Sequence, residues 1–82
     1  MKIYKNSDGK CNSSGRMIRS LRENAGLSQE ELAAKAQLSG YNITQKAISR
    51  IETGDRVVAD YEIILFAGIF HVSADQLLGL TK

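Results

Sequence analysis

The stretch from residue 26 to residue 54 carries the start and stop signals of two short helices. Ser28 opens the first, and Glu31 stands three residues later, the spacing of a capping box in which each residue hydrogen-bonds the backbone N–H of the other. Thr44 opens the second, and Gly54 follows it where a left-handed residue commonly ends a helix. We therefore predict two short helices in succession, around which the rest of the chain must pack.

Apolar spacing and further capping residues predict three more helices. Ser13 or Ser14 begins the first, an apolar segment over about 60–70 forms the fourth, and Ser73 begins a short last one. No segment alternates as a strand does, so the expected fold class is all-α, a compact five-helix domain. The side chains expected to face the core are Met17, Ile18, Leu21, Ala25, Leu32, Ala33, Ala36, Leu38, Ile43, Ala47, Ile48, Ile51, Leu77, Leu78 and Leu80.

The length of 82 residues allows one domain with one modest core. Residues 1–12 are rich in turn formers, so we expect an N-terminal arm with little regular structure, followed by the domain over 13–82. No apolar run approaches the roughly 20 residues needed to cross a membrane, and the first residues lack the core of a secretion signal. Cys11 is the single cysteine and cannot form an internal disulfide, which favours a reducing, cytoplasmic setting.

The charges are distributed unevenly along the chain. Residues 1–56 hold ten of the eleven Lys and Arg residues with six acids, whereas residues 57–81 hold three acids and no Lys or Arg. This pattern fits a basic face toward a polyanion and an acidic, apolar end turned elsewhere. Ordinary scatter of surface charge can produce the same asymmetry, so it decides nothing alone.

The sequence shows no residue pattern typical of catalysis or metal binding. His71 is the only histidine and suits the C-terminal end of the helix over 60–70, and a single distant cysteine does not complete a metal site. No Ser-His-Asp arrangement, working carboxylate pair or Gly-rich phosphate loop is apparent. We expect no enzyme activity, no metal and no cofactor.

Three segments together resemble one known family. Residues 18–33, IRSLRENAGLSQEELA, resemble the start of the phage repressor/Cro-like, or XRE-type, helix-turn-helix domain. Residues 48–54, ISRIETG, resemble the end of its recognition helix, and residues 72–79, VSADQLLG, resemble its closing helix. The resemblance covers about residues 14–80. It implies a lambda-repressor-like fold and a small bacterial or phage transcriptional regulator, a repressor, that binds double-stranded DNA sequence-specifically.

The link between the two central helices departs from the commonest family pattern. The segment Gln37–Ile43 makes it about five residues longer, as in a variant with an extended first helix or a wider turn. Two readings stay open for Tyr41 and Asn42, which either reach the DNA backbone or only pack and turn. How closely the N-termini of the two helices approach each other also stays open.

The resemblance implies that the exposed start of the second central helix reads base edges. The residues at those positions are Gln45, Lys46 and Ser49, with Arg50 beside them. Their chemistry agrees, because Gln pairs bidentately with adenine and Lys donates to the acceptors of guanine. Without the resemblance, an ordinary solvated helix face explains these residues equally well.

The resemblance also implies phosphate contacts and one structural ion pair. Gln29, at a helix N-terminus that favours an anion, is expected to bind a phosphate and to steady Gln45. Arg22 is expected to form a bidentate pair with Glu52 that ties the first helix to the recognition helix. The further phosphate candidates are Arg16, Arg19, Lys35, Tyr41, Asn42, Thr44, Thr53 and Arg56.

The segment over 60–70 is more apolar than one side of a core contact requires. Because the family implies dimers on two half-sites, we predict a two-fold homodimer through Tyr61, Leu65 and Ile69. Alternatively, Leu65 packs under the arm, against Ile3 or Tyr4. A rival function uses the same helix in a protein-interaction module, such as an antitoxin or a partner of another regulator. The sequence does not identify the operator, the regulated genes or an inducer.

Overall fold

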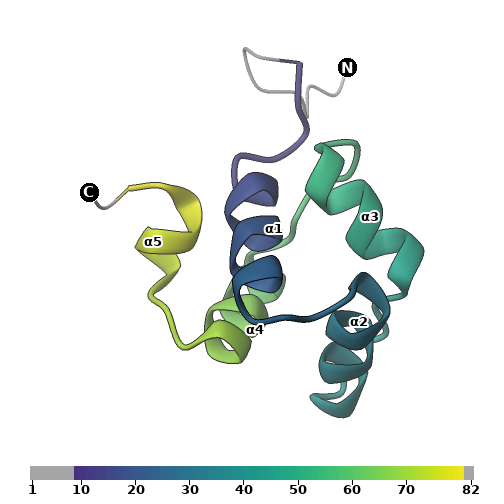
Figure 1. Ribbon diagram of the computed structural model, residues 1–82. Coiled ribbons are helices and arrows are strands. Elements are labelled where there is room, and N and C mark those ends of the chain that lie inside the picture. Colours follow the sequence, from purple (N-terminus) through teal and green to yellow (C-terminus); the bar gives the residue numbers. More distant parts are fainter. Residues whose placement is uncertain (1–8, 81–82) are drawn as a thin grey trace.

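The computed structural model describes residues 9–80, which contain five helices and no strand (Figure 1). The all-α prediction is therefore confirmed. No helix in this part of the chain is long and apolar enough to cross a membrane. Most of the predicted arm, including Ile3 and Tyr4, lies outside the described residues. The helices are α1 (Gly15–Asn24), α2 (Gln29–Leu38), α3 (Gln45–Thr53), α4 (Asp60–Phe70) and α5 (Ala74–Leu78).

Helix α1 stands in the middle of the domain, with α2 and α3 on one side and α5 on the other (Figure 1). It packs against α3, α4 and α5, while α2 packs against α3 and α4. The core between them is apolar and closely packed. Its fully buried side chains include Ile18, Leu32, Ile48, Ile51, Phe66 and Leu77.

The helix starts predicted from capping residues are confirmed. The Ser28 hydroxyl accepts from the Glu31 N–H at 3.0 Å, and the Ser28 N–H donates to the Glu31 carboxylate at 2.8 Å, which completes the capping box. Thr44 accepts from the N–H three residues on at 3.2 Å, and Ser73 does the same at 3.0 Å. Gly54 ends α3 with a φ of 85°, in the left-handed region.

The start of α1 is capped by a residue that the sequence did not single out. Ser14 occupies the position before the helix, as predicted, but the Asn12 side chain accepts from the Gly15 N–H at 2.8 Å. The Asn12 amide also donates to the carbonyls of Ile51 at 3.0 Å and Arg56 at 2.8 Å. Asn12 therefore joins the first turn of α1 to the end of α3. The approach is so close that a Cβ added at Gly15 would collide with the Ile51 carbonyl oxygen.

Several predicted side-chain orientations are wrong. Leu65 is only 7% exposed and lies in the core, so the prediction that it contributes to an exposed dimer surface fails. Its neighbour Ile64 is the exposed one, at 70%. Leu38 and Leu80 were expected to face inward but are 88% and 71% exposed. Ala25 is also exposed, because it follows α1 as its C-cap instead of continuing the buried stripe.

Candidate nucleic-acid interface

The N-termini of α2 and α3 lie together despite the long link between the helices. The Gln45 amide donates to the Gln29 side-chain oxygen at 2.7 Å, so the contact that the sequence left open is present. The link folds back on α2, where the Gln37 amide donates to the Ile43 carbonyl at 3.0 Å. Ile43 is 3% exposed and anchors the link in the core, as predicted. The extra residues therefore form a wider turn without separating the two helix starts.

The Arg22–Glu52 ion pair is present as predicted. The Arg22 guanidinium donates to both carboxylate oxygens of Glu52, with Nε–Oε2 and Nη2–Oε1 distances of 2.6 and 3.0 Å. Its Nη1 donates to the Leu27 carbonyl at 2.8 Å. The side chains of Arg22 and Glu52 are only 11% and 3% exposed. The hydrogen bonds to Glu52 raise the pKa of Arg22 above its ordinary value, so the guanidinium keeps its charge.

The ion pair continues into the contact between the two glutamines. The Gln29 Nε2 donates to the Glu52 Oε1 at 3.0 Å. An ionised carboxylate only accepts hydrogen bonds, so it must face the NH₂ end of the Gln29 amide. The Gln29 oxygen then faces Gln45, which can meet it only with its own NH₂ group. The buried carboxylate thus fixes the direction of every hydrogen bond from Arg22 to Gln45.

The outer end of this chain of hydrogen bonds is exposed. Gln45 keeps its side-chain oxygen and one N–H for an external partner, since the contact with Gln29 uses only the other N–H. Lys46 and Arg50 are exposed on the same helix, and Ser49 is half-buried. The four residues predicted to contact bases therefore all lie on α3. Gln45 is the best positioned of them, because its amide is hydrogen-bonded to Gln29 of α2.

A second group of predicted residues surrounds an open hollow of about 460 Å³ between the start of α1 and the end of α3. Arg16 and Arg19 line it from α1, and Thr53 lines it from α3. Lys10 also lines it and was not predicted, because it lies in the segment expected to be irregular. Its ammonium group donates to the Thr53 carbonyl at 3.1 Å, and the Cys11 N–H donates to the Gly54 carbonyl at 2.8 Å. The last part of the arm is thus attached to α3.

Arg56 has a different environment from that expected of a phosphate ligand. Its guanidinium forms two hydrogen bonds with the Glu62 carboxylate, at 2.9 and 3.0 Å, which connect the segment before α4 to that helix. Burial alone would raise the pKa of Glu62, but the hydrogen bonds from Arg56 and the Ala59 N–H, with the charge of Arg56, hold that pKa below its ordinary value. The same hydrogen bonds raise the pKa of Arg56. The pair is structural and was not predicted from the sequence.

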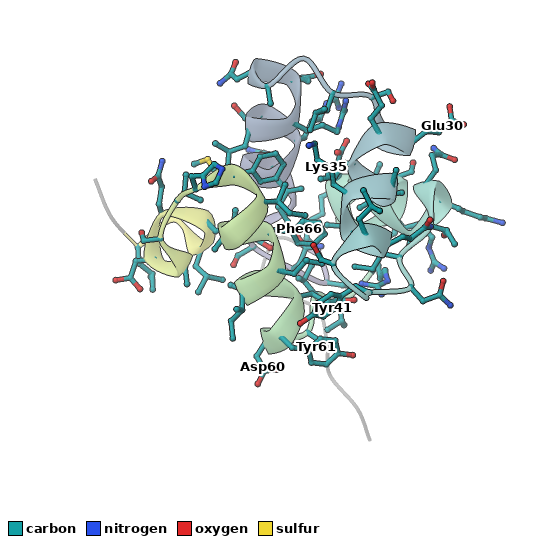
Figure 2. The ribbon with its side chains drawn as sticks, turned by 90° about the horizontal axis from the view of Figure 1, so that it is seen from below. Glu30, Lys35, Tyr41, Asp60, Tyr61 and Phe66 are labelled. Atoms are coloured by element: carbon teal, nitrogen blue, oxygen red, sulfur yellow. The ribbon has the colours of Figure 1, made fainter. Side chains whose placement is uncertain are left out.

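Other phosphate candidates are also distant from the glutamine pair or bound within the domain. Tyr41 stacks on Tyr61 of α4 with 6.1 Å between ring centroids, as Figure 2 shows, which favours the packing role considered for it. Lys35 lies in the last turn of α2, at the opposite end from Gln29. The Thr44 hydroxyl caps α3, and the Thr53 hydroxyl is within hydrogen-bond distance of the Asp55 carboxylate at 2.9 Å. Asn42 is exposed in the link.

Comparison with known proteins identifies the family. The family model HTH_3, described as helix-turn-helix, matches residues 18–77. The solved structure titled the crystal structure of the DNA-binding domain of BldD is similar with a TM-score of 0.71 and 26% sequence identity, over 89% of this chain and 99% of that one. No curated protein matches the chain. Because the family model covers well over half of its residues, the chain belongs to the XRE-type helix-turn-helix family.

Proposed function

We propose that the protein binds double-stranded DNA sequence-specifically, as a small transcriptional regulator that reads the major groove with α3. The observation that carries this proposal is the directed series of hydrogen bonds from Arg22 through Glu52 and Gln29 to Gln45. The Arg22–Glu52 pair ties α1 to α3 and, through Gln29, also orients the exposed Gln45 amide, which keeps a donor and an acceptor for an external partner. The helix-turn-helix family and the similarity to the DNA-binding domain of BldD support the same function.

The atoms left on Gln45 suit one base in particular. Adenine presents N7 as an acceptor and its N6 amino group as a donor in the major groove. The remaining N–H of Gln45 can donate to N7 while its oxygen accepts from N6. Because Glu52 fixes the orientation of both glutamine amides, the flipped Gln45 amide, with its oxygen toward the Gln29 oxygen, is disfavoured before DNA binds. Lys46 and Arg50 are the neighbouring exposed donors and suit the N7 and O6 acceptors of guanine.

Phosphate contacts are proposed on both sides of the reading end. Gln29 keeps a second N–H at the N-terminus of α2, where unpaired backbone N–H groups and the helix dipole also attract an anion. Lys10, Arg16 and Arg19 place three cations around the hollow beside α1. Such contacts fix the position of the protein on DNA and add affinity without reading sequence. Arg56 is left out, because Glu62 holds its guanidinium.

Repression is the proposed outcome of binding, because a domain seated in the major groove occludes the bound site. A promoter carrying the bound sequence upstream of a reporter tests this directly. Expression should fall when the protein is supplied and should recover with a Gln45→Ala variant. Higher expression with the wild-type protein would show activation instead, without affecting the proposal of DNA binding.

Selection of bound duplexes from a random pool tests the proposed DNA binding. The wild-type protein should enrich one sequence motif, and Gln45→Ala should enrich the same motif with one adenine position relaxed. Gln76→Ala is the matched control, since Gln76 is an exposed glutamine on α5, away from the glutamine pair. It should enrich the wild-type motif unchanged. A pool that stays random after selection with the wild-type protein would refute sequence-specific reading.

A further inference from the structure

The carbonyls at the end of α3 accept hydrogen bonds from an earlier segment of the chain. Residues 10–12 donate to the carbonyls of Ile51, Thr53 and Gly54, and to that of Arg56 in the segment that follows the helix. The last four carbonyls of a helix have no partner within it, so residues 10–12 supply part of what the end of α3 lacks. Three consecutive residues thus attach to the C-terminal end of the helix proposed to read DNA.

The side chain of Asn12 joins three backbone segments at once. Its oxygen accepts from the Gly15 N–H at 2.8 Å, and its NH₂ group donates to the carbonyls of Ile51 at 3.0 Å and Arg56 at 2.8 Å. A neutral amide offers two N–H donors and one oxygen, so these contacts use both donors and fix the direction of the group. Asn12 is half-buried and keeps no N–H for an external partner. Any effect of Asn12 on DNA binding therefore passes through the backbone that it holds.

We propose that Asn12 is a positioning residue for base reading, which sets the angle of α3 on α1 and so the place of Gln45 against DNA. This inference rests on the proposed function of α3. A helix held at one point can pivot, whereas α3 is held at two points of α1. Asn12 holds it at the first turn of α1, and Arg22 holds it from the last turn through Glu52, about 10 Å farther along the helix axis.

The length of α3 makes its far end sensitive to the Asn12 contact. Gln45 is six residues before Ile51, a distance of about 9 Å along the helix axis. A tilt of about 10° at Ile51 would displace Gln45 by about 1.5 Å, which exceeds the whole range of hydrogen-bond lengths. No Cβ fits at Gly15 against the Ile51 carbonyl, so the two backbones can separate there but not approach. Loss of the Asn12 contacts would therefore tilt α3 away from the start of α1.

Asn12→Asp tests the proposal on DNA. Aspartate has the shape of asparagine and keeps an oxygen for the Gly15 N–H, but it turns a second oxygen toward the two carbonyls that the amide binds. Its affinities for the selected duplex and for a scrambled duplex are measured at a temperature at which the variant is fully folded. The ratio of the two affinities should fall about tenfold, because only binding to the selected site depends on the place of α3.

Ser13→Asp is the matched control, since it adds the same charge at the exposed neighbouring residue. It should weaken both affinities by one factor and leave their ratio unchanged. Asn12→Ser keeps an acceptor for the Gly15 N–H and loses both donations without adding charge, so it should lower the ratio as well, and it replaces Asn12→Asp if that variant does not fold. Asn12 variants that are folded and keep the wild-type ratio would overturn the proposal, whatever their melting temperature.

NMR of the protein without DNA separates this proposal from the proposed function. Asn12→Asp and Asn12→Ser should shift the amide signals of α3 as far as the side chain of Gln45, whereas Ser13→Asp should shift only those near its own position. Unchanged Gln45 signals in both Asn12 variants would overturn the positioning role. Equal binding of the wild-type protein to the two duplexes would refute the proposed function instead, and these signals would still decide whether Asn12 positions α3.

Discussion

Replacing Glu52 with alanine should destabilise the fold by about 3–5 kcal/mol, because it leaves the buried Arg22 guanidinium without its partner. The carboxylate accepts three hydrogen bonds, two from Arg22 and one from Gln29, and its side chain is 3% exposed. Water cannot replace these contacts without opening the packing between α1 and α3. A protein of this length has a total stability of roughly 4–12 kcal/mol, so the loss is a large part of the whole.

Urea unfolding followed by circular dichroism measures this effect, and the melting temperature should fall by more than about 10 °C. Arg22→Ala should destabilise by a similar amount, and the double variant by less than the sum of the two. Glu23→Ala is the matched control, since Glu23 pairs with Arg19 at 3.3 Å but both side chains are more than half exposed. It should change stability by less than about 1 kcal/mol. A loss below about 1 kcal/mol for Glu52→Ala would show that the pair does not hold α1 to α3.

Three further predictions concern base reading by α3, the packing around two glycines and the Arg56–Glu62 pair. In fluorescence anisotropy, Gln45→Ala and Lys46→Ala should each lose about 1–3 kcal/mol of binding free energy on the selected site and much less on random DNA. Equal losses on the two DNAs would show that these residues do not read bases. Gly15→Ala should destabilise the fold by about 1–3 kcal/mol, because the new Cβ would clash with the Ile51 carbonyl. Gly68→Ala should stabilise the fold by about 0.5–1 kcal/mol, because Gly68 lies in open space on a helix. A higher melting temperature for Gly15→Ala than for Gly68→Ala would contradict this packing. The pKa of Glu62 is lowered from 4.5, so its contribution to stability is present above that pH and is lost as the pH falls through the lower folded pKa. In urea unfolding between pH 6 and pH 3, Glu62→Gln should therefore lose less stability than the wild-type protein. Equal losses in the two proteins would contradict the Arg56–Glu62 pair.

The features predicted correctly from the sequence depend on local chemistry. Ser28, Thr44 and Ser73 cap their helices, because a hydroxyl before a helix meets the N–H groups that the first turn leaves unpaired. The Arg22–Glu52 pair joins residues thirty positions apart and could be predicted only through the resemblance to a known family. The sequence alone contains no local signal for it.

The features predicted wrongly depend on how the segments pack in the folded domain. Helix α4 is apolar on nearly all sides, so its periodicity does not distinguish the buried Leu65 from the exposed Ile64. Asn12 lies in a segment without helical or strand pattern, yet its amide bonds to the carbonyls of two residues about forty positions away. Arg56 had the charge of a phosphate ligand, but the fold places it against Glu62. Neither the apolar periodicity nor the capping residues of the sequence indicate any of these arrangements.

Titration of the wild-type protein on its selected duplex and on a scrambled duplex, at several salt concentrations, tests the central claim most directly. Binding to the selected site should be at least about 1,000-fold tighter than to the scrambled one at physiological salt. Both affinities should fall as salt rises, because Lys and Arg displace counterions from phosphates. Equal affinity for the two duplexes, or no binding to either at low salt, would contradict the proposal that α3 reads DNA.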